Sequence, residues 1–264
     1  MIEVDLRPGL RGGRWARLRE LSGADEAWAA EGRVASSLAA VELLERLLVP
    51  TPGTTVGPDR ARELAVGDRD RLLAAIYRRT FGGAIESAAT CTSCGESFDL
   101  AFDLGDLLPP PRGGAARFDE DGLLTLTDGR RVRLPNLDDE LALRQLRGGT
   151  ATACLCRRLV VEGDPELDPA AVLAEVEEAS PFAERELVAA CPECGAQQAL
   201  RFVLQSFLLA ALAREGEWLM REVHRLAVTY HWPLAEILGL PRSQRRRYVA
   251  LIEREAAARR RMSR

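Results

Sequence analysis

One short unit occurs twice in this chain: CTSCGESFDLAFDL runs from Cys91 to Leu104, and CPECGAQQALRFVL runs from Cys191 to Leu204. The cysteines, the glycine after the second cysteine and the alternate apolar residues recur at one constant offset. Apolar and polar residues alternate after each glycine, which predicts a β-strand. The sequence therefore predicts two Cys-x-x-Cys-Gly turns, which we call the knuckles, and each knuckle leads into a strand.

The cysteines of the knuckles have the spacing of metal ligands. Cys-x-x-Cys places two thiolates on one tight turn, and the following glycine permits the left-handed backbone that such a turn needs. Two pairs complete a tetrahedral shell without an open position, so we expect one structural Zn²⁺ rather than a catalytic one. The predicted ligands are Cys91, Cys94, Cys191 and Cys194.

Three other interpretations of the four cysteines stay open. A redox Cys-x-x-Cys pair normally occurs once, at the start of a helix, whereas both copies here precede a predicted strand. Structural disulfides belong to oxidising compartments, and the sequence shows no export signal. Reduced cysteines with a purely structural role are the third alternative.

The distance between the knuckles defines the expected fold. Zinc ribbons commonly separate their knuckles by about 15–20 residues, but 96 residues lie between Cys94 and Cys191. We therefore expect an α+β, mainly helical fold with a split four-cysteine zinc ribbon, an α+β insertion between its knuckles and a C-terminal helical segment. The expected domains are an N-terminal helical region (1–85), the ribbon (86–104 and 186–204), the insertion (105–185) and a C-terminal helical region (205–264).

Periodicity and turn residues predict the elements around the knuckles. The N-terminal region is expected to be mostly helical after a short strand in IEVDL, with helices from Ala24 or Asp25, from Ser37, over 59–64 and over 68–80. The insertion opens with Pro109–Pro111 and Gly113–Gly114 and continues with a hairpin at 123–134, a helix capped by Asn136 or Asp138, a helix over Pro169–Ala179 and a strand in ERELVAAC. One long helix over Gln205–Tyr230, a short one over 233–238 and a final one from Pro241 to about Arg260 complete the chain.

Composition argues against an enzyme. All 36 basic residues are arginine, which excludes lysine nucleophiles and Schiff-base chemistry. His224 and His231 are the only histidines, and a packing or hydrogen-bonding role is expected for both. No nucleophile elbow, Walker motif or dinucleotide-binding motif occurs. Cys154 and Cys156 lie in an apolar, helical stretch and are expected to be buried free thiols. We expect a non-enzymatic protein without a small-molecule substrate.

The charge pattern and hydropathy favour a soluble protein. The net charge is only −4, and the longest clearly apolar run, Phe207–Ala213, is too short to cross a bilayer. No basic flank precedes an apolar run near the N-terminus, so a cytoplasmic location without membrane contact is the expectation.

Arginines cluster after Pro241. AEILGLPRSQRRRYVALI has a short helix, a glycine turn and an arginine-rich helix, as the second half of a DNA-binding helix-turn-helix would. The position two after Ser243, which such a motif keeps apolar for its core, is Arg245. Nucleic acid is therefore the less favoured partner, and an exposed arginine face that binds protein is the alternative. Its candidate residues are Arg242, Arg245, Arg246 and Arg247.

Four segments in this order resemble one family. They are LRELSGADEAW (Leu18–Trp28), VGDRDRLLAAIYRRTFG (Val66–Gly82) with its knuckle, the second knuckle, and the segment His224–Glu253. This pattern resembles the baseplate or tail-assembly proteins of T4-like contractile phage tails, in the version carried by bacterial phage-tail-like contractile injection systems. Paired knuckles and a long insertion are not part of the minimal phage form.

The resemblance implies a structural baseplate component or a chaperone-like assembly factor, with other baseplate or tail-assembly proteins as partners. It also implies that the C-terminal helices are anchored by Tyr230, Trp232, Leu240 and Tyr248. A zinc-containing DNA-binding or regulatory protein with a helix-turn-helix-like C-terminus remains the second hypothesis.

Overall fold

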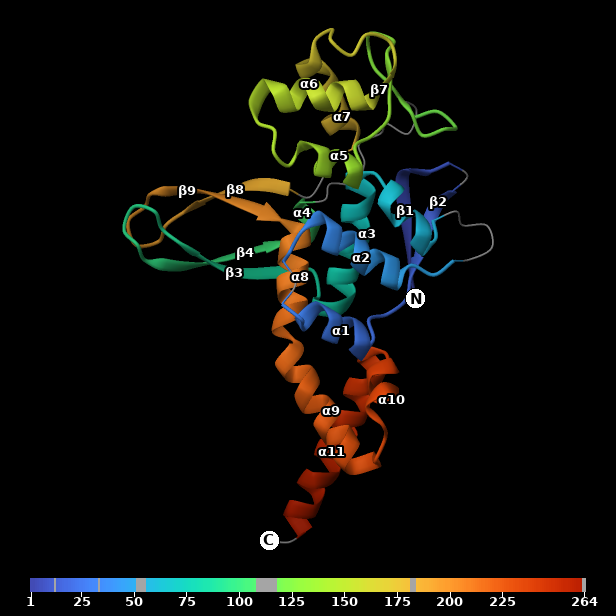
Figure 1. Ribbon diagram of the computed structural model, residues 1–264. Helices are drawn as coiled ribbons and strands as arrows, with labels where there is room; N and C mark the ends of the chain where they lie inside the picture. The colour runs from blue at the N-terminus through green and yellow to red at the C-terminus, as the bar shows by residue number, and fades with distance from the viewer. Residues whose placement is uncertain (12, 33, 51–55, 108–117, 181–183, 263–264) are drawn as a thin grey trace.

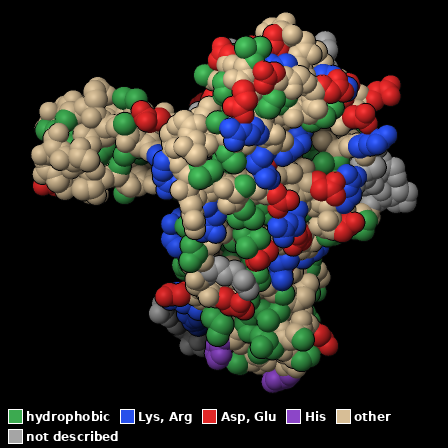
Figure 2. All heavy atoms as spheres, turned by 45° about the horizontal axis from the view of Figure 1, so that its top comes forward, with side chains coloured by type: hydrophobic (Ala, Val, Ile, Leu, Met, Phe, Trp, Pro, Cys, Tyr) green, Lys and Arg blue, Asp and Glu red, His purple; other side chains and the backbone are tan. Residues whose placement is uncertain are grey.

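The computed structural model describes residues 1–11, 13–32, 34–50, 56–107, 118–180 and 184–262. The chain is α+β, as expected, and three parts project from a central body (Figure 1). We call them the arm (β3, β4, β8 and β9), the insertion lobe (β5 to α7) and the C-terminal lobe (α9 to α11). Figure 2 shows the arm standing clear of the rest, with few charged side chains on this face.

The body is built from the N-terminal region and from the helices that follow the first and the second knuckle hairpin. Its elements are β1 (Ile2–Leu10), β2 (Gly13–Leu18), α1 (Gly23–Ala30), α2 (Ser37–Leu47), the 3₁₀ helix η1 (Pro58–Glu63), α3 (Val66–Phe81), the short α4 (Leu104–Leu107) and α8 (Leu204–Arg214). Leu44, Leu72 and Leu208, from α2, α3 and α8, are fully buried in its core. The expected helices are present, but the N-terminal region also forms an antiparallel hairpin because GRWARL pairs with the first strand.

The arm consists of two antiparallel hairpins that repeat each other. In the first, β3 (Ala84–Thr90) pairs with β4 (Ser97–Asp103), and in the second, β8 (Glu184–Ala190) pairs with β9 (Gln197–Val203). Both have the same register, since Thr90 pairs with Ser97 and Ala190 pairs with Gln197. The rings of Phe102 and Phe202 meet edge to face with centroids 5.2 Å apart, so the two hairpins pack against each other.

The repeat extends into the helix before each hairpin. Leu72 and Ile76 of α3 and Val172 and Val176 of α7 (Pro169–Ala179) stand at the constant offset of the cysteines, and all four are buried. The repeated unit is therefore a helix followed by a knuckle hairpin.

The insertion lobe has its own apolar core. Its elements are β5 (Leu124–Thr125), β6 (Arg131–Val132), α5 (Leu137–Leu143), α6 (Gly148–Leu159), β7 (Val160–Glu162) and α7. Leu124, Val132 and Leu159 are fully buried in that core. Asn136 caps α5, as expected, and accepts from the Asp138 and Asp139 N–H groups. Pro109–Pro111 and Gly113–Gly114, expected to open the insertion, lie outside the described residues.

The C-terminal lobe contains α9 (Gly216–Tyr230), α10 (Leu234–Gly239) and α11 (Arg242–Met262). The prediction of one helix over Gln205–Tyr230 is wrong, because α8 ends at Arg214 and α9 begins at Gly216. Gly216 lies against α1, where an added Cβ atom would stand 2.8 Å from the Cβ of Ala30. Within the described ranges, no helix combines the length and hydropathy needed to cross a lipid bilayer.

Aromatic contacts hold the C-terminal lobe together. Tyr230 stacks on Trp232 with centroids 4.9 Å apart, and Tyr248 meets Trp232 edge to face at 5.1 Å. These three side chains pack against the buried Leu226 and Ile237. The backbone carbonyl of Leu240 accepts from the Gly23 N–H of α1 at 3.3 Å.

Candidate metal centre

Each knuckle is a tight turn closed by its own backbone. The Cys91 N–H donates to the Glu96 carbonyl at 2.8 Å, and the Gly95 N–H donates to the Cys91 carbonyl at 2.9 Å. Gly95 has φ 80° and Gly195 has φ 74°, so both occupy the left-handed region that glycine tolerates best. The second knuckle repeats the pattern, with the Gly195 N–H 2.9 Å from the Cys191 carbonyl.

The turns bring all four cysteine sulfurs together at the tip of the arm. The four Sγ atoms lie within 4.8 Å of one another. Across the knuckles, Cys91 Sγ is 3.6 Å from Cys194 Sγ, and Cys94 Sγ is 3.8 Å from Cys191 Sγ. A tetrahedral ion with metal–sulfur bonds of about 2.3 Å needs sulfur separations of about 3.8 Å. The predicted ligands therefore form one cluster with dimensions that fit a metal ion.

The cluster is half enclosed. Cys91 and Cys191 are buried, whereas Cys94 and Cys194 are exposed. The separations across the knuckles far exceed the S–S bond of a disulfide, which is about 2.05 Å, so the four thiols are free. Four sulfur donors in this geometry suit Zn²⁺ or iron.

Gln198 joins the two knuckles directly. Its buried Oε1 accepts from the Thr92 N–H at 3.0 Å and from the Thr92 hydroxyl at 2.9 Å. In the other hairpin the same place is taken by the buried ring of Phe98. This hydrogen-bonded link was missed in the sequence, where a glutamine in an alternating strand carries no specific signal.

Backbone N–H groups of the first knuckle stabilise the thiolate form of Cys91. Hydrogen bonds from the backbone N–H groups of Cys94 and Ser93 lower the pKa of Cys91 to about 6. The Glu96 backbone N–H also favours a Cys94 thiolate, but burial and the neighbouring sulfurs outweigh it and raise the pKa of Cys94 to about 12. Neighbouring thiols therefore cannot all ionise together unless a cation compensates their charge.

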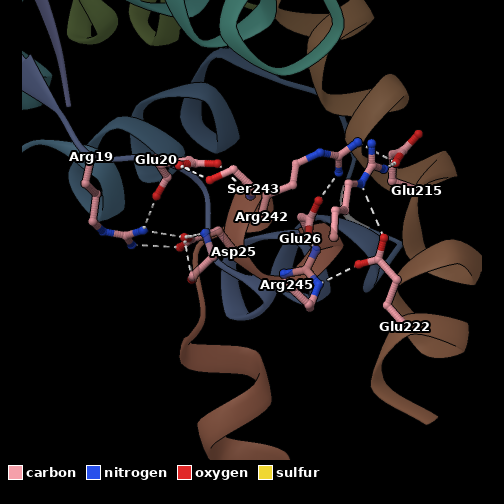
Figure 3. A network of polar contacts seen from close by, with 11 residues as sticks. Arg19, Glu20, Asp25, Glu26, Glu215, Glu222, Arg242, Ser243 and Arg245 are labelled. Carbon is pink, nitrogen blue, oxygen red and sulfur yellow. Dashed lines mark hydrogen bonds and ion pairs between the residues drawn. The ribbon is translucent and has the colours of Figure 1, made fainter. Parts of the chain in front are cut away.

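The predicted arginine face is wrong for two of its four members. Arg242 and Arg245 are buried, and both guanidinium groups donate to the carboxylate of Glu26 on α1 (Figure 3). Arg245 Nε also donates to Glu222 at 2.6 Å, and Arg242 Nη2 donates to Glu215 at 2.6 Å. The physical reason is helical spacing, because residues three apart share a face and this one turns toward α1 and α9.

Arg246 and Arg247 lie on the exposed side of α11. Arg246 still binds acidic groups, with Nη2 at 2.6 Å from Glu215 and Nε at 3.2 Å from Glu222. Its side chain is 46% exposed, and Arg247 is exposed. Sequence reasoning missed the three glutamates of this network, although the spacing of Arg242 and Arg245 relative to the apolar Val249 indicated a buried face.

The first turn of α1 also contains a second buried carboxylate, that of Asp25. Asp25 pairs with Arg19 at 2.5 Å and with Arg46 at 3.0 Å, and it accepts from the Ser22 N–H and hydroxyl at 2.9 and 2.7 Å. Burial by itself raises the pKa of Asp25, but the hydrogen bonds from Arg19 and Ser22 lower it below its ordinary value. Asp25 therefore fixes α1 to the segment after β2 and to α2, and Glu26 fixes α1 to the C-terminal lobe.

The remaining candidate residues do not form a site together. Cys156 is buried, and its thiol lies 3.3 Å from the Pro169 carbonyl, whereas Cys154 is only half-buried. His224 and His231 are both exposed, so neither packs in a buried core, and the alternative expectation, a hydrogen-bonding role, stays a prediction. His231 ends α9 with φ 58°, and its N–H donates to the Ala227 carbonyl at 3.0 Å.

No protein-family model matches the sequence, and neither a curated protein nor a solved structure is significantly similar to the chain. The cysteine cluster and the arrangement of the lobes therefore carry the functional argument.

Proposed function

We propose that this chain is a non-enzymatic structural or assembly component of a phage-tail-like contractile baseplate, and that one structural Zn²⁺ closes its arm as a split zinc ribbon. The observation that carries the metal part of the proposal is the meeting of Cys94 and Cys191, 97 positions apart, in one four-sulfur cluster. The whole insertion (105–185) lies between these two residues in the sequence.

A structural role for the ion follows from the donor set. Four protein thiolates fill a tetrahedral shell, so water or substrate has no coordination position. Zn²⁺ has no redox chemistry of its own, and it is the ion that four-cysteine ribbons most often hold. Binding across a long loop stabilises the folded chain because it restricts the unfolded one.

Two observations support an assembly role. The described molecule is a body with three projecting parts, which offers separate surfaces to several partners (Figure 1). The buried carboxylates Asp25, Glu26 and Asp139 are each paired with two arginines, as in a structural network rather than a catalytic one. The order of the four family-like segments in the sequence supports the baseplate as the place of action.

The DNA-binding hypothesis has less support. A recognition helix needs its arginines free to reach phosphates and base edges. Arg242 and Arg245 instead bind Glu26 and are buried, which leaves Arg246 and Arg247 from the candidate set. The exposed arginines of α11 are better explained as a solvated or protein-binding surface.

The two hypotheses are separated by partner binding. An affinity-tagged chain is co-expressed with the sheath, tube and baseplate proteins of a contractile particle, and binding to duplex DNA is measured by fluorescence anisotropy at 50 and 200 mM salt. We expect co-purification with baseplate proteins and no salt-dependent DNA affinity. A DNA affinity that falls about 10³-fold or more between these salt concentrations, without co-purification, contradicts the proposal.

A further inference from the structure

A cavity of about 310 Å³ lies where the insertion lobe meets the body. Its lining residues come from α3, from α5, α6 and α7, and from the junction of β9 with α8. Apolar side chains form most of the wall, among them Leu143, Leu155, Leu173 and Leu204. This volume is at the lower end of the range for ligand sites, and it suits one large side chain and its adjoining peptide groups.

Two residues that line this cavity, Arg69 and Gln205, each have a buried polar side-chain atom without a hydrogen-bond partner. Arg69 is 4% exposed, and its two terminal nitrogens donate to Glu140, but its Nε has no acceptor. Asp70 Oδ1 forms an ion pair with that Nε at 3.6 Å, outside hydrogen-bond distance. On the other side, Gln205 Nε2 donates to Ser37 Oγ at 3.1 Å, while the buried Gln205 Oε1 accepts nothing.

An unpaired buried donor and an unpaired buried acceptor destabilise the protein unless a ligand or water satisfies them. The donor calls for a carbonyl or carboxylate oxygen, and the acceptor calls for an N–H or O–H group. Four carboxylate residues also line the cavity, and Arg69 is the one basic residue among its lining residues, so an anionic ligand is disfavoured. The carboxylate residues are Asp70, Asp139, Glu140 and Glu177.

We propose that this cavity binds an apolar side chain of a partner polypeptide together with its backbone amides. A carbonyl of the segment accepts from Arg69 Nε, an N–H donates to Gln205 Oε1, and a leucine-sized side chain fills the space between the leucines. A peptide segment combines a carbonyl acceptor, an N–H donor and an apolar side chain without a net charge. The cavity site is independent of the metal centre and gives the junction of body and lobe a partner-binding role of its own.

The test uses the full metal-bound chain with ¹³C-labelled leucine and valine methyl groups. N-acetyl-L-leucinamide is titrated to millimolar concentration and followed by NMR. Two matched probes are N-acetylglycinamide, which lacks the isobutyl group, and N-acetyl-L-leucine, which is an anion at pH 7. We expect saturable shifts confined to methyl groups of the cavity, such as those of Leu143 and Leu173, and at least tenfold weaker binding of both matched probes.

Two variants separate the site from general apolar binding. Leu173→Phe fills the cavity, Gln205→Leu removes the acceptor at similar size, and each is expected to weaken binding of N-acetyl-L-leucinamide at least fivefold. Leu167→Phe, at a position 59% exposed and outside the cavity lining, is the control and keeps full affinity. The proposal is overturned if no cavity methyl group shifts, if the three probes bind equally, or if Gln205→Leu, confirmed as folded by its methyl spectrum, binds as wild type does.

Discussion

Arg245 and Arg246 are neighbours in sequence with different energetic roles. Arg245 is 1% exposed and pairs with Glu26 and Glu222, so its removal takes one of the two arginine partners from each of these carboxylates. Arg246 contacts Glu215 and Glu222 from a side chain that is 46% exposed, where water screens the interaction. The difference lies in burial and not in the number of partners.

The first prediction concerns this pair. Arg245→Ala is expected to lower the free energy of unfolding by about 3–5 kcal/mol, because breaking a buried ion pair is strongly destabilising. Arg246→Ala is the matched control and is expected to cost about 1 kcal/mol or less. Urea denaturation at pH 7 measures both. Equal losses in the two variants would show that the network in Figure 3 is not buried as described.

The second prediction concerns Asp25 and acid. Its pKa is lowered in the folded protein, and an unfolded aspartate has a pKa of about 3.9. Its charge therefore stabilises the fold above about pH 4, and that contribution is lost as the pH falls through the lower folded pKa. Stability measured by urea denaturation between pH 7 and pH 2.5 should fall less steeply in Asp25→Asn than in wild type. Parallel curves for the two proteins would contradict the assigned role.

At the scale of elements, the sequence correctly predicted those helices, strands and caps that depend on residues close together in the chain. The alternating residues after each knuckle, the helix Pro169–Ala179 and the cap at Asn136 are all present, because each depends on neighbours within a few positions. The strand GRWARL was missed because its apolar and polar residues do not alternate strictly, although Gly12–Gly13 is a turn signal. The break at Glu215 was also missed, and it lies next to Gly216, which packs against α1.

The third prediction tests that contact. Gly216→Ala places a Cβ atom 2.8 Å from the Cβ of Ala30, so overpacking should cost about 1–3 kcal/mol of stability. Gly149→Ala is the matched control, since Gly149 is helical and a Cβ atom there meets nothing within 4 Å. Helix propensity predicts that Gly149→Ala stabilises by up to about 1 kcal/mol. Thermal unfolding compares the two, and a Gly216→Ala protein as stable as wild type would show that α1 and α9 do not touch there.

At the scale of the whole molecule, the residues of the candidate site differ in how far apart in sequence their partners lie. The four candidate metal ligands could be predicted because their type and local spacing define the chemistry before folding. Gln198 and the burial of Arg242 and Arg245 could not, because their partners are fixed only when distant elements pack together. Arg242, for example, pairs with a residue 216 positions away.

The fourth prediction concerns the arm as a unit. If the metal joins the hairpins, chelation should separate them while the core of the body, around Leu44 and Leu72, persists. Hydrogen exchange is expected to speed up for residues 84–103 and 184–203 after treatment with a zinc chelator, and to change little in α2 and α3. Uniform acceleration across the chain would mean that the ion stabilises the whole fold and not the arm.

Metal content is the most direct test of the central claim, the zinc-closed arm. Elemental analysis of purified protein is predicted to find one zinc per chain in wild type and in the Cys154→Ser control, and to find none bound stably in Cys91→Ser or Cys191→Ser. One iron per chain in place of zinc would keep the claim that a metal closes the arm, but would identify that metal as iron. Wild-type protein that contains no metal and stays fully folded in chelator would contradict the account.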